Sequence, residues 1–185
     1  TKTVEFAMGG SGVNLVRGTP WNPWDATTHR VPGGSSSGSA VAAAAGLCGF
    51  AIGSDTGGSV RIPAFSGTFA LKTTKGLWPT ESVSSLSASL DTLGPITRTA
   101  ADTGIVFAAL QGTPAPRPSS PRGLRLGRPA DYFFDDLDAD VERCVDAALK
   151  ALAEAGVEIV DVALPFVHEH RQMIFTLCAV EFIAW

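Results

Sequence analysis

The sequence is poor in cysteine. It contains three cysteines, Cys48, Cys144 and Cys178, an odd number with no C-x-x-C pair among them. This pattern favours neither a disulfide framework nor a cysteine zinc site, and it is typical of reduced thiols in a cytosolic protein. We therefore expect a cytoplasmic protein without a metal centre.

Charged side chains are scarce as well, at 17% of the 185 residues, and their formal sum is −4. No cluster of Lys and Arg is present, so the sequence lacks the electrostatic footprint of a nucleic-acid-binding protein. Hydrophobic residues make up 45% of the chain. This composition favours one globular domain with a substantial core over a disordered chain.

Long apolar runs are also missing. The longest covers residues 40–52, is interrupted by glycine, and is too short to cross a bilayer. No secretory signal is visible, because the chain starts Thr-Lys-Thr-Val-Glu-Phe without an initiator Met or an apolar segment. Both ends interrupt sequence that reads as structured. We therefore expect a piece of a longer protein that has no contact with a membrane.

Two loops rich in Gly and Ser are the most distinctive feature that the sequence does contain. Residues 33–39 read G-G-S-S-S-G-S, and residues 53–59 read G-S-D-T-G-G-S. Glycine lets backbone amides point at one spot without interference from a Cβ atom. Joined by a buried element, the two loops can face one another across a site, with Ser35 and Ser59 as candidate reactive hydroxyls.

The segments around these loops predict alternating helices and strands. Residues 39–46 are small and predict a central helix, and the Ile-Pro-Ala sequence at residues 62–64 is expected to break regular structure. A helix is predicted from residue 100 to 110, with Thr99 as its N-cap and Gly112 just beyond its end. Buried or ordered strands are expected over residues 49–54 and 69–76, and loops over residues 9–24, 55–59 and 82–89.

The carboxy-terminal part predicts a strand, a helix and a strand in succession. An apolar stripe with helical spacing runs between residues 138 and 155, acidic residues crowd its first turn, and Gly156 follows its end. Short strands at residues 124–128 and 157–162 complete an α/β pattern. The apolar stripe between residues 138 and 155 consists of Val141, Cys144, Val145, Ala148, Leu149 and Leu152. The Pro-rich segment 113–121, which precedes this part of the chain, is predicted to be an exposed connector.

Taken alone, residues 55–59 permit three interpretations. They can form an ordinary turn after a strand, an aspartic-protease loop of the D-T-G type, or a nucleophilic serine after two glycines. The protease interpretation needs a second such loop, which the sequence lacks. In the third interpretation the amides of residues 56–59 converge on an oxyanion, and Ser59 needs a base close by.

Residues 33–39 have competing interpretations too. A flexible linker would not lead straight into a buried segment, and a phosphate loop of the G-x-x-x-x-G-K-[ST] type would need a lysine. His29, with Asp25 or Asp55 behind it, could act as the base of a triad, although a histidine beside Arg30 is more often a surface residue.

The remaining aromatic and histidine side chains have simpler interpretations. Trp21 and Trp24 are expected to pack over the core, with stacking on a carbohydrate or a base as the alternative. His168 and His170 lack the i, i+4 spacing of a helical zinc pair and are interpreted as a solvated helix face. We therefore expect no metal and no cofactor.

Together these motifs resemble one known family. G-G-S-S-S-G-S-A-V-A-A-A-A-G, G-S-D-T-G-G-S-V-R-I-P-A and L-K-T-T-K-G are similar to the amidase signature family of serine hydrolases, as are the flanking K-T-V-E-F-A-M-G and D-T-L-G-P-I-T-R-T-A-A-D. The resemblance implies a partial amidase signature domain over residues 1–185, with a signature core at 1–112, the connector at 113–121 and an α/β continuation at 122–185. The implied fold is α/β, with a mixed central β-sheet flanked by helices on both faces.

The resemblance also implies a site built on a Ser–Ser–Lys triad. Ser59 matches the nucleophile that accepts the acyl group. Ser35 matches the bridging serine, whose peptide bond with Gly34 is cis in the family. Thr56, Gly57 and Gly58 match the residues whose amides bind the oxyanion. Ser36, Asp55 and Arg61 match the residues that support both loops. Met8 matches a position whose backbone lines the acyl pocket.

The third group of the family's triad is a lysine, which burial keeps neutral so that it can act as a base. In the family it lies several dozen residues before the bridging serine, so this chain begins too late to contain it. Lys2, Lys72 and Lys75 match other positions. The chain also departs from the family pattern between Ser59 and Lys72, where it is shorter by a residue, and at Ala70, which replaces a glycine.

The implied activity is hydrolysis of an amide bond in a small-molecule substrate through an acyl-enzyme at Ser59. A direct nucleic-acid partner is not expected, and a homodimer stays open. Two alternatives remain: the A subunit of a glutamine-dependent tRNA amidotransferase, and a truncated, non-catalytic member. The segment A-M-G-G-S-G-V-N differs from the S-T-E type of the transfer-RNA enzymes and favours the amidase. Without the lysine, the 185 residues alone are expected to be inactive.

Overall fold

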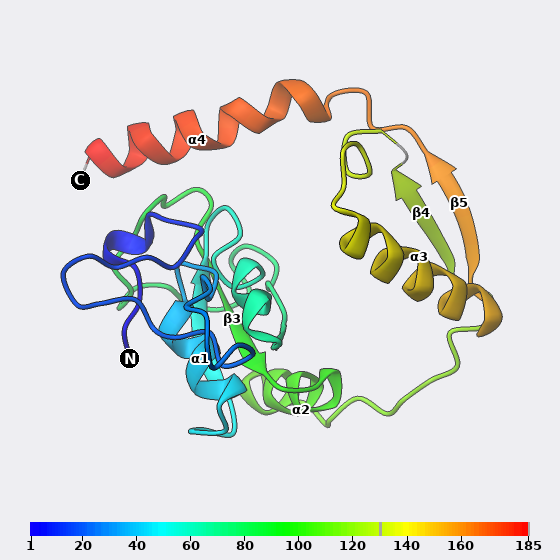
Figure 1. Cartoon of the computed structure of the whole chain (residues 1–185), viewed down its shortest axis with the longest axis horizontal. Coiled ribbons are helices and arrows are strands. Elements are labelled where there is room, and N and C mark those ends of the chain that lie inside the picture. The colour runs from blue at the N-terminus through cyan, green and yellow to red at the C-terminus, as the bar shows by residue number, and fades with distance from the viewer. Residues whose placement is uncertain (130, 185) are drawn as a thin grey trace. The chain divides into compact units, whose positions relative to one another are not determined.

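A computed structural model of the chain describes residues 1–129 and 131–184, without the side chains of residues 168 and 171. The chain divides into two compact units, residues 1–116 with 175–185, and residues 117–174 (Figure 1). The division falls inside the Pro-rich segment 113–121. The expectation of a solvated surface at His168 lies outside the described side chains.

The first unit is built on a three-stranded antiparallel sheet. Strand β3 (Thr92–Thr97) lies between β1 (Ala51–Asp55) and β2 (Phe69–Ala70) and is antiparallel to both. Its Ile96 pairs with Ala51 on one side and Ala70 on the other, and is fully buried. The sequence did not predict β3, since its Gly94 and Pro95 are poor residues for a central strand.

Two predicted strands differ from the observed ones. β1 is only half-buried, because Ile52 is 39% exposed while Gly53 and Asp55 are buried. The strand predicted over 69–76 ends at Ala70. The amide of Leu71 still donates to the carbonyl of Pro95 at 3.1 Å, and the chain then turns away through a bond from Leu77 N to Thr74 O.

Helix α1 (Ser37–Ala44) is the predicted central helix and begins two residues earlier than expected. It packs on β1 and β3, and its Ala40 and Ala43 form the core with Val60 and Ile96. Gly38 faces the amino-terminal segment so closely that a Cβ atom there would lie 2.3 Å from the carbonyl oxygen of Lys2. Small residues are therefore what allows this helix to occupy the centre of the unit.

Helix α2 (Ala100–Gln111) confirms its predicted caps. The Thr99 side chain accepts a hydrogen bond from the amide of Asp102 at 3.1 Å, and Gly112 ends the helix with a left-handed φ of 66°. The helix packs on β2 and β3 and directly follows β3 in the chain (Figure 1). Its ends follow from local signals, which the sequence carries in full.

Short 3₁₀ turns occur at Glu5–Ala7 and Ile62–Ser66. The second corrects the expectation that the Ile-Pro-Ala sequence breaks regular structure. Pro63 lies in the first turn of that segment, where its missing N–H would have no partner anyway.

The two tryptophans do not pack into the core as expected. Trp21 is 45% exposed and stacks on the ring of His29 with centroids 4.5 Å apart, and Trp24 is 75% exposed. Each indole instead binds a backbone carbonyl: Trp21 Nε1 lies 2.5 Å from the oxygen of Asp25, and Trp24 Nε1 lies 2.7 Å from that of Ser66. The polar edge of each ring therefore fixes its position.

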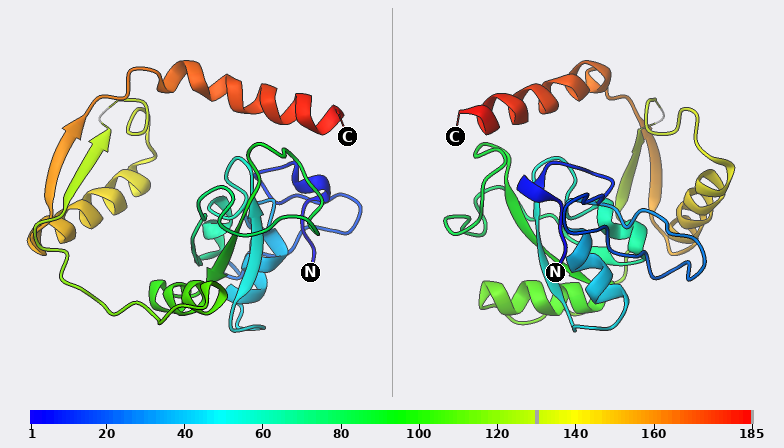
Figure 2. Two further views of the ribbon diagram at one scale, coloured as in Figure 1. Left: turned by 180° about the vertical axis from the view of Figure 1, so that it is seen from behind. Right: turned by 60° about the vertical axis from the view of Figure 1, so that its left-hand side comes forward.

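The second unit is a strand–helix–strand arrangement, as predicted. β4 (Arg125–Pro129) and β5 (Glu158–Val162) are parallel, and helix α3 (Ala139–Glu154) connects them and lies along them (Figure 2). The side chain of Asp138 caps α3 by accepting from the amide of Asp140 at 2.9 Å. No residue of α3 is buried, so its apolar stripe remains largely exposed.

Helix α4 (Val167–Ile183) follows, and its last turns belong to the first unit. Among the described residues, no helix combines the length and apolar character needed to cross a membrane. Near its end Glu181 accepts hydrogen bonds from Ser87 Oγ at 2.5 Å and from the Ser89 amide at 3.0 Å, and it also accepts from Ser89 Oγ. These bonds tie α4 to the serine-rich loop 82–89.

The hydrogen bonds that Glu181 accepts predict that the stability of the protein depends on pH. Hydrogen bonds from Ser87 and then Ser89 lower the pKa of Glu181 below its ordinary value of 4.5. A lowered folded-state pKa gives a stabilisation that is present above the ordinary pKa and lost as pH falls through the lowered one. Glu181→Gln should therefore lower the Tm at neutral pH, and the difference from wild type should shrink in buffers below the pKa. Differential scanning calorimetry across pH checks this.

The matched control is Glu81→Gln, which alters an exposed carboxylate of the first unit that has no hydrogen-bonded side-chain partner in the described chain. We expect its Tm to follow that of the wild type at every pH. A Glu181→Gln deficit that stayed constant from neutral to acidic buffers would contradict the assignment of the effect to the carboxylate.

Candidate active site

The two Gly/Ser loops meet through their backbones. The amide of Ser36 donates to the carbonyl of Ser59 at 3.2 Å, and Ser36 Oγ donates to the carbonyl of Ser54 at 3.3 Å. Ser35 and Ser59 are both buried, at 3% and 7% exposure. The peptide bond between Gly34 and Ser35 is cis, as the resemblance implies. The loops expected to face one another are therefore adjacent.

Glycine allows the first loop to pack against neighbouring backbone. A Cβ atom on Gly34 would lie 2.4 Å from the carbonyl oxygen of Gly9, and one on Gly33, whose φ is +77°, would lie 2.4 Å from that of Ile62. Hydrogen bonds fix this approach, from Gly34 N to Gly10 O at 2.7 Å and from Val4 N to Ser35 O at 3.0 Å. The amino-terminal segment thus holds Ser35 in place.

Asp55 organises the second loop from inside. Its carboxylate is fully buried and accepts from the amides of Gly58 and Val60 at 3.0 Å each, and from Arg61 Nη2 at 3.0 Å and Nε at 3.2 Å. Burial acts to raise the pKa of Asp55, but the bond to Arg61 and the backbone amides outweigh it, so this pKa lies below 3.8. The same contact raises the pKa of Arg61. The pair is therefore ionised at neutral pH.

The amides of the 56–59 turn differ in their availability. The amide of Gly58 already donates to Asp55 Oδ1. Those of Thr56, Gly57 and Ser59 donate to no group in the described part of the chain. An oxyanion in this turn would therefore meet free donors from residues 56, 57 and 59, whereas the amide of Gly58 has a partner in this structure.

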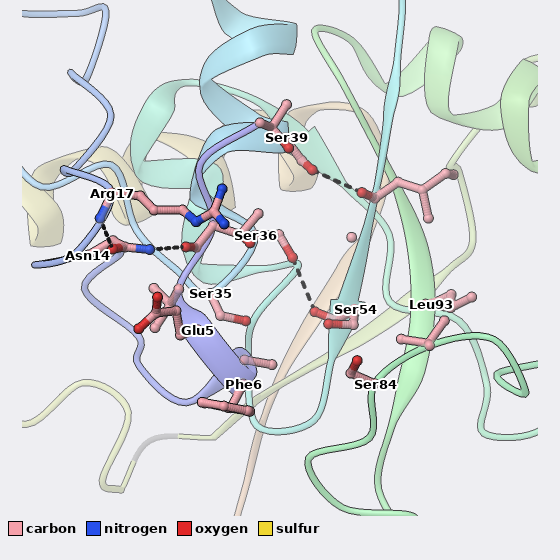
Figure 3. A pocket seen from close by; sticks show the side chains of 17 residues that line it. Glu5, Phe6, Asn14, Arg17, Ser35, Ser36, Ser39, Ser54, Ser84 and Leu93 are labelled. Atoms are coloured by element: carbon pink, nitrogen blue, oxygen red, sulfur yellow. Dashed lines mark hydrogen bonds between the residues drawn. The ribbon is translucent and has the colours of Figure 1, made fainter.

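A cavity of about 560 Å³ opens beside Ser35 (Figure 3). Figure 3 shows Ser35 and Ser36 between Glu5 and Phe6 of the amino-terminal segment and Ser54 of β1. Ser59 and Met8 are not among the residues that line it, and Met8 is 49% exposed. The cavity therefore adjoins the proposed bridging serine rather than the proposed nucleophile.

The described residues bring no base to either serine. The hydroxyls of Ser35 and Ser59 make no hydrogen bond within the described chain, and no described lysine lines the cavity. Lys72 Nζ donates to the carbonyl of Thr73 at 3.1 Å, and Lys75 Nζ to that of Ala88 at 2.6 Å. These contacts agree with the interpretation that neither lysine is the catalytic base.

His29 is exposed and is not the base of a triad in this structure. It stacks on Trp21, and its nearest polar contact is the carbonyl of Pro20, 3.5 Å from Nε2. Asp25 is occupied by Arg30, with Oδ2 2.8 Å from Nε. Among the described residues, no group of three or more His, Cys, Asp or Glu side chains is placed to hold a metal ion.

One buried carboxylate beside the second loop, Asp91, was not predicted from the sequence to belong to the site. Asp91 is buried at 7% exposure and accepts a hydrogen bond from Thr56 Oγ1 in the second loop. In the sequence Asp91 begins the family-like segment D-T-L-G-P-I-T-R-T-A-A-D, but the resemblance assigned it no role in the site. Its partner in the second loop, Thr56, lies 35 residues away in the chain, too far for any local pattern to pair the two residues.

Comparison with known proteins supports one identification of these motifs. The family described as Amidase matches residues 1–185. A 2-amino-5-chloromuconic acid deaminase of Comamonas testosteroni is 51% identical over 174 residues, covering 91% of this chain and 38% of that protein. The A subunit of a glutamyl-tRNA(Gln) amidotransferase from Desulfotalea psychrophila is 42% identical over 177 residues, covering 87% of this chain and 36% of that protein.

Structural comparison agrees with the sequence comparison. A crystal structure of an amidase superimposes with a TM-score of 0.88 at 33% identity, over 98% of this chain and 41% of that one. The chain thus spans 38% of the length of the first of these relatives and 41% of the matched structure. Its fold is the corresponding part of that α/β architecture.

Proposed function

Because this chain belongs to the amidase family, we propose that the protein containing it hydrolyses a carbon–nitrogen amide bond of a small-molecule substrate. The observation that carries the proposal is the direct backbone bond from Ser36 to Ser59, which holds two buried serine loops together. Serine acyl transfer needs a nucleophile, a proton path and oxyanion donors in one place. In this proposal Ser59 is the nucleophile, the amides of the 56–59 turn are the oxyanion donors, and Ser35 is one member of the proton path.

In the proposed mechanism Ser59 Oγ attacks the amide carbonyl carbon. Its proton passes to Ser35 and from there to a lysine that the family resemblance places upstream of this chain. The amides of Thr56, Gly57 and Ser59 stabilise the negative charge that develops on the carbonyl oxygen. The proton returns to the leaving nitrogen as the carbon–nitrogen bond breaks, and the products are an acyl-enzyme on Ser59 and free ammonia or amine.

Water completes the proposed cycle. It attacks the acyl-enzyme carbonyl while Ser35 and the upstream lysine accept its proton, and the carboxylic acid leaves as Ser59 recovers its hydroxyl hydrogen. Ser36, Asp55 and Arg61 act on the loops rather than on the substrate, and the backbone of Met8 contributes to the acyl pocket. No cofactor enters these steps.

The proposal also covers the domain organisation, the cellular compartment and the binding partners of the enzyme. We assign the signature core to residues 1–112 and the continuation to residues 122–185, joined by the Pro-rich connector. The three free cysteines are compatible with a reducing compartment, for which we propose the cytoplasm. A small-molecule amide is the proposed binding partner, with neither a direct nucleic-acid contact nor a membrane contact.

A component of a tRNA amidotransferase is the second candidate, favoured by the 42% identity to the glutamyl-tRNA(Gln) amidotransferase chain of Desulfotalea psychrophila. The same acyl-transfer site would then release ammonia from glutamine for another reaction. Such a component would co-purify with partner proteins, whereas the proposed amidase would turn over amides by itself. A truncated, non-catalytic relative is the third candidate, and it would turn over nothing.

Ammonia release tests these candidates. The intact protein, expressed from its natural reading frame, should release ammonia from one or more of a panel of primary amides without any partner. The 185-residue chain alone should release none, because it lacks the proposed base. Release that needs glutamine and co-purified partner proteins would favour the amidotransferase, and turnover by the short chain alone would contradict the proton path.

A further inference from the structure

A carboxylate to which the family resemblance assigned no role reaches into the proposed nucleophile loop. Asp91 lies just before β3 and is 7% exposed, and Thr56, which follows β1, is 5% exposed. The hydroxyl of Thr56 donates to Asp91 Oδ1. Hydrogen bonds with an ionised partner are among the stronger ones in proteins, and burial reduces competition from water.

The remaining bonds of Asp91 fix the carboxylate itself. Its oxygens also accept from Ser85 Oγ at 2.7 Å, from the Leu86 amide at 2.9 Å and from the Ser87 amide at 3.1 Å and 3.2 Å. Lys75 Nζ donates to the backbone carbonyl of Asp91 at 3.0 Å. The carboxylate therefore has donors on several sides, and its position is set independently of Thr56.

The turn of residues 56–59 is thus held at both of its ends. Asp55 binds the amide of Gly58, and Asp91 binds the side chain of Thr56. A second bond from the same side, from Thr92 Oγ1 to the carbonyl of Asp55 at 3.0 Å, secures the start of the turn. Gly57 lies between these anchors and Ser59 directly follows them, and the amides of both have no partner in the described chain.

We propose that Asp91 is a positioning residue for acyl transfer, acting through the hydroxyl of Thr56 to fix the turn that carries Ser59. This inference rests on the proposed function of Ser59. The carboxylate does not touch the reacting atoms. It holds the free amides of residues 56, 57 and 59 in the orientation that an oxyanion needs, and a displacement of such donors by about 1 Å can cost a hundredfold in rate.

The test compares Thr56→Val and Asp91→Asn in the intact protein. Valine has the shape of threonine without its hydroxyl, so it removes the bond with little change in volume. We expect Thr56→Val to lower kcat by about tenfold with little change in KM, since the loss concerns the transition state. It should slow the reaction of Ser59 with a fluorophosphonate by a similar factor.

The rate of the double variant distinguishes a positioning role of Asp91 from a general loss of stability. Asp91→Asn should lower kcat at least as much as Thr56→Val, and the double variant should be no slower than Asp91→Asn alone, because the charged bond between Thr56 and Asp91 is lost in both single variants and can be lost only once. If the two losses multiply instead, the proposed path through Thr56 is wrong. All rates are measured well below the lowest Tm of the set.

The matched control is Thr103→Val on α2. It removes another buried threonine hydroxyl, which lies 2.6 Å from Thr97 Oγ1 and outside the two loops. It should lower the Tm and leave kcat within about twofold of wild type, since distant sites act independently. An equal loss of kcat in Thr103→Val would overturn the inference by making the effect one of stability.

These experiments distinguish a failure of the proposed function from a failure of the proposed positioning role of Asp91. A wild-type protein with neither amide turnover nor labelling would overturn the proposed function and this inference with it. A wild type that turns over amides and labels at Ser59, but whose kcat is unchanged by Thr56→Val, would overturn the positioning role of Asp91 alone.

Discussion

Replacing Ser59 by alanine in the intact protein should lower amide turnover by about four orders of magnitude or more. The proposed acyl-enzyme cannot form without the Ser59 hydroxyl, and removal of a serine nucleophile in comparable triads has effects of this size. The fold should survive, because Ser59 contributes its carbonyl and not its side chain to the bond with Ser36. Steady-state kinetics with circular dichroism on both proteins check the prediction.

Ser35→Ala extends this prediction to the proton path. If Ser35 carries the proton between Ser59 and the base, its loss should also lower kcat by orders of magnitude, and the two changes together should cost little more than either alone. The matched control is Ser66→Ala, a fully buried serine whose hydroxyl binds the carbonyl of Pro32 at 2.9 Å. That variant should lose stability and keep its kcat. Turnover by Ser59→Ala near the wild-type level would refute the assignment of the nucleophile.

Asp55→Ala should destabilise the first unit strongly, by about 3 kcal/mol. The substitution leaves the buried amides of Gly58 and Val60 without an acceptor, and Arg61 without its ionised partner. We place the loss at the lower end of the range for broken buried pairs, because the Arg61 side chain is 54% exposed and water can solvate it. Urea unfolding should show a lower midpoint with an unchanged slope.

Asp25→Ala is the matched control for Asp55→Ala. Asp25 also pairs with an arginine, Arg30, at 2.8 Å, and also accepts backbone amides, from Thr27 and Thr28, but on the protein surface. Its replacement should shift the midpoint much less than that of Asp55. If both variants unfolded at the same urea concentration, the burial of Asp55 would not be the cause of its importance.

Local signals let the sequence predict several elements correctly. The ends of α2 follow from Thr99 and Gly112, and α3 follows from a regular apolar stripe capped by Asp138. The two short strands predicted around α3 are present, and they pair in parallel because a strand–helix–strand succession leaves few alternatives. Each of these predictions uses residues within a few positions of one another.

Features that depend on distant partners were missed. Strand β3 contains Gly94 and Pro95 and is a strand only because β1 and β2 pair with it on both sides. Trp24 is held by the carbonyl of Ser66, a partner 42 residues away, and not by the core. Asp91 meets Thr56 across 35 residues of chain, so no local pattern could indicate that contact.

The candidate site also has one feature that the sequence predicted and one that it did not. The sequence motifs, through their resemblance to the amidase signature family, implied the cis bond before Ser35, and the structure confirms it. The motifs did not indicate that the amide of Gly58 is already bound to Asp55, because that depends on how the carboxylate folds back into its own turn. The catalytic roles of Ser35 and Ser59 stay predictions.

Labelling of the intact protein with a fluorophosphonate, followed by peptide mapping, tests the central claim most directly. The reagent forms a stable phosphoester with an activated serine, so it reports the nucleophile without knowledge of the substrate. We predict a single label on Ser59, lost in Ser59→Ala and strongly reduced in Ser35→Ala. A label on any other serine, or no label on an intact protein that hydrolyses amides, would contradict the account.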